Sequence, residues 1–243
     1  MVYVLLMIAA LGSGIVQGVT GFGAGVLMML VLANLFDLPQ AAGLSGMIGL
    51  TLVSAMAFRY RSAINFRIII WPCLLFLLGS TIAISLSKGL NQSLLKMAFS
   101  LFLIGLSAYF LWQKKELELK ASLPVMLGVG LFSGLCDGFF SIGGPLMVIL
   151  YLAMTSSVEE YLGSLQLSFA LAGLYSFSLR FFSGIITAQL LPFALVGVVA
   201  IQLGLQIGNH IVDRIDAGLL RRLTYAFIGI SGAITLVTTL LTL

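Results

Sequence analysis

Long apolar runs separated by short polar breaks make up most of the chain. A helix needs about 20 apolar residues to cross the hydrocarbon core of a bilayer. The runs cover residues 2–36, 40–58, 68–87, 91–113, 123–154, 159–179, 189–209 and 219–242. The pattern therefore predicts an all-α integral membrane protein with about eight hydrophobic regions, two of which are longer than one crossing requires.

These two longest runs are each interrupted by a glycine-rich stretch. The first reads SGIVQGVTGFGAG over residues 13–25, and the second reads SGLCDGFFSIGGP over residues 133–145. Glycine weakens a helix, and a helix that breaks inside lipid leaves backbone groups unpaired at several kcal/mol each. Such a break is tolerated where protein or a water-filled cavity covers it. The sequence therefore predicts two broken helices that line one shared site.

The two halves of the chain repeat one another. At an offset of 120 residues, Gly14 aligns with Gly134 and Pro72 with Pro192. Both prolines are expected in the first turn of a helix, where a missing N–H costs least. Internal repeats of this kind are common in secondary transporters. We expect ten helical segments, a broken pair and three further helices in each half, with the first repeat at 1–113, a charged linker at 114–122 and the second repeat at 123–243.

The relative direction of the halves depends on how the broken segments cross the membrane. As one helix, residues 4–33 would reach about 45 Å, which is more than one core of about 30 Å and less than two. If each segment crosses once, the halves are parallel and the twelve Lys and Arg residues divide 7 to 5 between the two sides. If each returns as a re-entrant hairpin, the halves are inverted and the division is 9 to 3. The positive-inside rule favours inverted halves, with the linker cytoplasmic and both termini outside.

Composition excludes several classes of protein. The 243 residues are 60% hydrophobic and 8% charged, whereas a soluble domain is about a quarter charged. The basic residues cluster at the ends of apolar runs and form no continuous face for a nucleic acid. Cys73 and Cys136 are far apart, which disfavours a thiol–disulfide carrier. No His, Cys, Asp or Glu set has metal-ligand spacing, and no Ser/His/Asp grouping indicates hydrolysis, so we expect no metal, no cofactor and no enzyme activity.

The glycine stretches have a chemistry that suits a small anion. A helix N-terminus presents unpaired N–H groups and about half a positive charge, and glycine lets a ligand approach the backbone. Two such ends aimed at one point bind an anion without a lysine or arginine in the lipid core. The alternative is close helix packing, because the glycines recur at small-xxx-small spacing. The candidate binding residues are Gln17, Thr20, Gly21, Phe22, Gly23, Gly25, Ser133, Ser141, Gly143 and Gly144.

Two ionisable residues stand out near these stretches. Asp137 is the one acid well inside an apolar run, and such a residue is a functional candidate by default. It is a candidate for a coupling proton, since a carboxyl group is more easily protonated when it is removed from water. The alternative is a structural carboxylate bonded to nearby backbone N–H groups. Arg180 either attracts anions to an outer vestibule or only extends its side chain toward the interface.

The paired glycine motifs resemble those of the TauE/SafE family of membrane proteins. Residues 16–25 are similar to its first signature, and residues 134–145 are similar to its second, a glycine-rich turn followed by an apolar helix. Ser141 stands where the second signature often has glycine, and Asp137 is not part of the usual motif. The resemblance implies a multi-pass transporter of the bacterial inner membrane that moves sulfite, sulfonates or sulfoacetate. For such a transporter the expected coupling ion is a proton or a sodium ion.

Three function classes remain open at this point. The leading hypothesis is a secondary transporter for small sulfur-containing anions that works by alternating access between its two halves. An anion channel on the same scaffold and a non-transporting membrane assembly factor are the alternatives. The lipid bilayer and a small anion are the expected partners, and the sequence makes no prediction about oligomeric state.

Overall fold

The fold is seen in a computed structural model that describes residues 1–112, 122–212 and 217–241. These residues form ten α-helices and no strand, and eight of the helices are long and apolar enough to cross a membrane. The all-α membrane fold with ten helical segments is therefore confirmed. In chain order the helices are α1 (Val2–Thr20), α2 (Ala24–Leu35), α3 (Leu38–Arg59), α4 (Phe66–Ser87), α5 (Gln92–Trp112), α6 (Leu123–Phe140), α7 (Gly144–Met154), α8 (Val158–Phe182), α9 (Leu191–Ile211) and α10 (Ala217–Leu241), with short 3₁₀ turns at Arg61–Ala63 and Ala188–Leu190.

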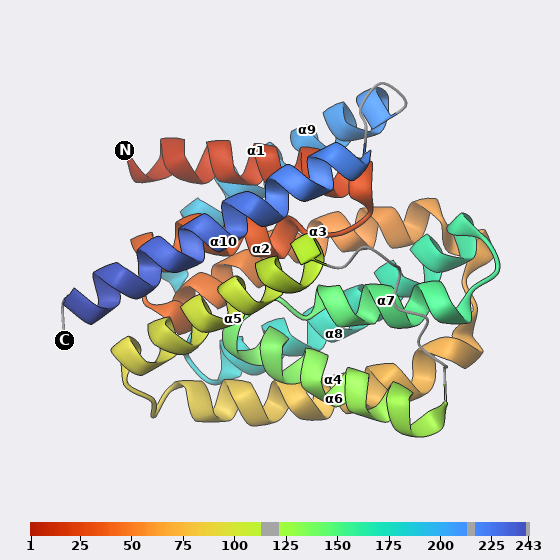
Figure 1. The fold of residues 1–243 in the computed structure, drawn as a ribbon, viewed down its shortest axis with the longest axis horizontal. Helices are drawn as coiled ribbons and strands as arrows, with labels where there is room; N and C mark the ends of the chain where they lie inside the picture. Colours follow the sequence, from red (N-terminus) through yellow and green to blue (C-terminus); the bar gives the residue numbers. More distant parts are fainter. Residues whose placement is uncertain (113–121, 213–216, 242–243) are drawn as a thin grey trace.

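The first broken region is a hairpin. Tyr3, at the start of α1, stacks on Phe193 with ring centroids 4.6 Å apart, and Phe36, just after α2, meets the same ring at 5.2 Å. The beginning of α1 and the end of α2 therefore lie on the same side of the molecule. The chain enters along α1, turns, and returns along the shorter α2 (Figure 1).

The second broken region turns back in the same way. Helix α6 runs alongside α4 in the same direction, because Gly130 lies against Pro72 near the start of α4 and Gly138 lies against Ser80 farther along. Just beyond the end of α7, the backbone N–H of Ser156 donates to Glu160, whose carboxylate also accepts from Asn65 at the start of α4. Helix α7 therefore returns to the side from which α6 departs.

The two halves are inverted relative to each other. Figure 1 shows both chain ends on the left, with α1 running to the right and its counterpart α6 running to the left. The pairing of helices follows the same symmetry, since α1 packs on α9 as α6 packs on α4, and the equivalent pairs α3 with α8 and α5 with α10 pack on each other. The inverted arrangement of the two halves, which the charge distribution predicted, is therefore confirmed. Residues 113–121, which hold nearly all of the predicted linker, lie outside the described residues.

Glycines set the close crossings between α1 and α9. A Cβ on Gly14 would overlap the carbonyl oxygen of Ile201, and a Cβ on Gly204 would overlap the carbonyl oxygen of Leu11. The same arrangement holds α4 against α6, where a Cβ on Gly134 would overlap the carbonyl of Phe76. The packing alternative is therefore correct for Gly14 and Gly18 of α1 and for Gly134 and Gly138 of α6. Glycine is needed at these positions because backbone approaches backbone.

Helix α4 begins earlier than the sequence suggested, which corrects the placement of Pro72. The side chain of Asn65 accepts the N–H of Arg67 and starts the helix at Phe66, so Pro72 lies inside α4 rather than in its first turn. Pro192 is the second residue of α9, so the two prolines are not structurally equivalent. The starts of α4 and α9, Phe66 and Leu191, are 125 residues apart in the sequence rather than 120.

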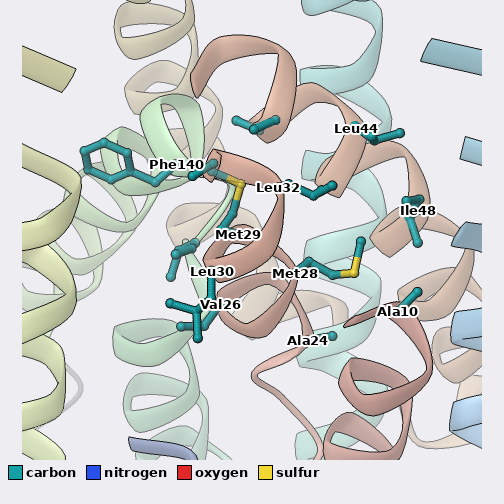
Figure 2. Packing of buried hydrophobic residues seen from close by; sticks show 14 of the residues in the cluster. Ala10, Ala24, Val26, Met28, Met29, Leu30, Leu32, Leu44, Ile48 and Phe140 are labelled. Carbon is teal, nitrogen blue, oxygen red and sulfur yellow. The ribbon is translucent and has the colours of Figure 1, made fainter. Parts of the chain in front are cut away.

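The short helix α2 lies in the centre of the protein. Figure 2 shows Met28 and Leu32 on the side of Leu44 and Ile48 of α3, and Met29 beside Phe140 of α6. A helix that is apolar on every face is stable when protein surrounds it. The start of α2, at the break, is buried, since Ala24 is 4% exposed, and a break covered by protein in this way is tolerated inside a membrane.

Candidate functional site

Both helix breaks depend on left-handed backbone. Gly21 has φ of 79° and closes α1 by donating its N–H to Gln17 O at 2.8 Å, and Gly23 has φ of 102° just before α2. Ser141 closes α6 with φ of 55° and is the one non-glycine residue with positive φ in the described part of the chain. Glycine adopts this region at little cost, whereas serine does not. The breaks therefore lie at residues 21–23 and 141–143, and the second break holds a serine in a backbone region that glycine favours.

The side chain of Gln17 bridges the first break. Its Oε1 accepts the N–H of Ala24, the first residue of α2, at 3.0 Å. The contact satisfies one of the N–H groups that a helix start leaves unpaired. Gln17 is buried, so this cap holds α1 and α2 together inside the protein.

The two breaks meet each other at the centre. A Cβ on Gly25 would lie 2.7 Å from the carbonyl oxygen of Ser141. Each break is also supported by the opposite half, because Gln166 of α8 donates its side-chain amide to Gly21 O at 2.8 Å and Gly46 of α3 faces the Ser141 hydroxyl. Gly46 and Gln166 are equivalent positions of the two repeats, 120 residues apart.

A cavity of about 120 Å³ lies where the breaks meet. Gly46 and Gly49 of α3 and Phe169 and Gly173 of α8 border it, about midway along helices that are long enough to span a bilayer. Eight of the residues singled out from the sequence line this cavity: Gln17, Phe22, Gly23, Gly25, Asp137, Ser141, Gly143 and Gly144. Residues from both glycine stretches therefore come together on one space.

Three of the candidate binding residues lie outside the cavity lining. The Thr20 hydroxyl is 2.8 Å from Val16 O and 2.7 Å from Phe22 O, so its proton is shared with nearby backbone carbonyls and is not directed at a ligand. Gly21 shapes the turn and accepts from Gln166. Ser133 is buried and faces a separate apolar pocket of about 240 Å³ between α5, α6 and the start of α7. These residues support the break or border a different space.

Asp137 and Arg180 are neighbours in the fold. The Asp137 carboxylate accepts from the hydroxyl of Ser176 at 3.2 Å and lies 3.4 Å from that of Ser80. Arg180 is 2% exposed, so the structure does not place it in an open vestibule. Its Nη2 donates to the carbonyl oxygens of Asp137 and Gly138 at 3.0 and 2.8 Å. A cation suits this position, because the last carbonyls of α6 carry partial negative charge.

Sequence reasoning missed part of the cavity wall. Ser45 is 2% exposed, borders the cavity and has no hydrogen-bond partner for its hydroxyl. Gly49 also faces the cavity, and a Cβ there would meet no atom within 4 Å. Small residues of a membrane helix commonly serve close packing, and Gly43 on the same helix does pack against Ile186. Whether a small residue packs against a helix or borders the cavity depends on its neighbours in space, which the sequence does not give.

The charged and metal-ligating groups of the cavity are few. Of the described residues that line it, Asp137 carries the one formal charge. Among residues 1–112, 122–212 and 217–241, no three His, Cys, Asp or Glu side chains gather closely enough to hold a metal ion. The cavity therefore offers a ligand backbone groups, hydroxyls, one amide and one carboxyl group.

Comparison with known proteins gives one match. The family model described as "Sulfite exporter TauE/SafE" matches residues 6–235, which is nearly the whole chain and includes both breaks. No curated protein and no solved structure matches it. With eight helices of spanning length, the chain is a multi-pass membrane protein, and it belongs to the TauE/SafE sulfite exporter family of membrane transporters.

Proposed function

We propose that this protein is a secondary transporter for small sulfur-containing anions, such as sulfite or a short sulfonate, and that the anion binds in the cavity between the two breaks. Membership of a family described as sulfite exporters supports the substrate class. The observation that carries the proposal is the cavity itself, which lies midway along the spanning helices and is walled by both interrupted regions. Transporter sites commonly occur at such a point.

The size of the cavity favours a compact substrate. A cavity of about 150 Å³ holds a benzene molecule. The volume here is about 120 Å³, which suits sulfite or a one- or two-carbon sulfonate. An aromatic sulfonate would require the walls to move apart.

The donors available at the cavity suit an oxyanion. Leu27 is the first residue of α2 whose N–H bonds within the helix, to Gly23 O, so the three preceding N–H groups have no acceptor there. The side chain of Gln17 accepts the N–H of Ala24. Gly25 and Val26, which carry the other two N–H groups, border the cavity. The Ser45 hydroxyl adds a buried donor without a partner. An anion that accepts these hydrogen bonds satisfies groups that are costly to bury unpaired.

The inverted halves supply a mechanism of alternating access. Rocking one half against the other opens the central cavity to one side and then to the other. The Arg and Lys distribution, 9 to 3, supports an orientation in a bacterial inner membrane with the linker in the cytoplasm and both termini outside. In this fold Arg180, one of the three on the outer side, is buried against α6 rather than exposed.

Flux through the purified protein in proteoliposomes tests the proposal. Vesicles are loaded with labelled sulfite or methanesulfonate, and efflux is followed with and without an imposed gradient. The expected result is slow, saturable flux that unlabelled sulfite competes with and that benzenesulfonate does not. Unitary currents in planar bilayers would instead indicate an anion channel. The absence of flux for every sulfur anion would contradict transport and favour an assembly role.

A further inference from the structure

The one formal charge on the cavity wall has the wrong sign for an anion. Asp137 lies at the end of α6 and borders the cavity, and no Lys or Arg belongs to the described lining. For two like unit charges about 6 Å apart at an effective dielectric constant of about 20, Coulomb repulsion weakens binding roughly 100-fold. An ionised Asp137 therefore opposes the ligand that the rest of the cavity suits.

The groups around Asp137 define what changes when it gains a proton. Helix α4 faces it with the Ser80 hydroxyl, α8 faces it with Ser176 and Arg180, and its own helix adds the buried thiol of Cys136. Arg180 is the other charged group there among the described residues, and its Nη2 is bonded to backbone carbonyls of α6. With Asp137 ionised the pair has no net charge, and with Asp137 neutral it carries one positive charge.

The repeat counterpart of Asp137 does not titrate. Gln17 occupies the equivalent position, 120 residues earlier, and its side-chain oxygen is bonded to the N–H of Ala24. The cavity therefore has one proton-accepting side chain among its described residues. The described lining can therefore bind one proton for each substrate anion, on Asp137.

We propose that Asp137 is the coupling site: the anion binds together with one proton on the Asp137 carboxyl group, and the loaded protein moves both across the membrane in the same direction. The inference rests on the proposed function, since it places the substrate anion in this cavity. The proton comes from water on one side and is released to water on the other as the anion leaves. A monoanion and a proton together carry no net charge, so each cycle is electroneutral.

Binding of methanesulfonate to the purified protein at several pH values tests this inference. Methanesulfonate remains a monoanion throughout, so any pH dependence belongs to the protein. The wild-type Kd is expected to rise as pH rises, by up to about 100-fold. Asp137→Asn should bind with a Kd that is independent of pH and close to the wild-type value at low pH. Glu159→Gln, which removes an exposed carboxyl group at the start of α8, should keep the wild-type pH dependence.

Flux measurements separate coupling from binding. In proteoliposomes, Asp137→Asn should still exchange labelled for unlabelled anion but should lose accumulation driven by a pH gradient. If this variant does not fold, Ser176→Ala provides the second measurement. Loss of a hydrogen bond to the ionised carboxyl group favours protonation, so the midpoint of the binding curve should move to higher pH.

Each contrary result has a distinct meaning. A wild-type Kd that does not change with pH would overturn the assignment of Asp137 as the coupling site, and so would an Asp137→Asn protein with the wild-type pH dependence. In either case, binding of the anion would still support the proposed function. Binding that requires sodium and ignores pH would also overturn it. If neither protein binds any sulfur anion at any pH, the proposed function itself is wrong and this inference falls with it.

Discussion

Replacing Gly49 with alanine separates stability from function in this protein. Gly49 lies inside α3 and borders the cavity, and a Cβ there would meet no atom within 4 Å. Alanine stabilises a helix interior relative to glycine by about 0.5–1 kcal/mol. For a chain of 150–250 residues, each kcal/mol corresponds to a change in Tm of roughly 2–4 °C. We therefore expect Gly49→Ala to unfold about 1–4 °C above the wild type.

The same methyl group should weaken substrate binding. It projects into a space of about 120 Å³ that the anion is proposed to fill. One additional methyl group in a fitted pocket changes affinity by about 1–3 kcal/mol, or roughly 10- to 200-fold. The variant is thus expected to be more stable and less active than the wild type, a combination that misfolding cannot produce.

Gly12 provides the matched control. It lies inside α1, a Cβ there would also meet no atom within 4 Å, and it does not border the cavity. Gly12→Ala should show a similar gain in Tm with unchanged sulfite flux. Thermal unfolding in detergent and labelled-sulfite flux in proteoliposomes measure the two quantities. Wild-type affinity in Gly49→Ala, or equal loss of flux in both variants, would refute the assignment of the cavity as the substrate site.

Three further substitutions test packing, donors and charge. Gly134→Ala forces α4 and α6 apart and should lower stability by about 1–3 kcal/mol in thermal unfolding, while Gly128→Ala on the same helix meets open space and should not. Ser45→Ala removes a buried hydroxyl without a partner and should raise the Kd for sulfite about 3- to 10-fold without loss of stability, whereas Ser13→Ala, also buried and unpaired but outside the cavity, should leave Kd unchanged. Arg180→Gln removes a charged donor from two carbonyls and should cost roughly 1.5–3 kcal/mol of stability, and a thermal unfolding curve like that of the wild type would contradict this.

The fold was predictable because its largest constraints act locally. A helix in lipid needs a continuous apolar run, so eight spanning helices followed from the hydrophobic pattern alone. The breaks were predictable because left-handed backbone at residues such as Gly21 and Gly23 favours glycine. The start of α4 was misplaced although a signal existed, because Asn65 is a favoured N-cap residue.

The site was only partly predictable, because the same residue types serve two roles. Glycines at 14 and 134 hold helices together, whereas Gly49 leaves room beside the cavity. No periodicity distinguishes a glycine that faces a partner backbone from one that faces empty space. The neighbourhood of Asp137 and Arg180 was also hidden, since 43 residues separate them and the contact depends on how α8 crosses α6.

The differences between the two breaks indicate how two repeats of one scaffold come to have different chemical roles. At the first break the polar side chains are used structurally, since Gln17 caps α2 and Gln166 holds the Gly21 carbonyl. At the second break Gln17 is replaced by Asp137 and Gly21 by Ser141; both border the cavity, and Asp137 is the ionisable one. A paired side chain has little left to offer a ligand, while an ionisable group beside the cavity changes its charge with the proton it holds. The symmetry that builds the cavity thus concentrates the proposed coupling chemistry on the second repeat, because coupling requires a group that differs between the two halves.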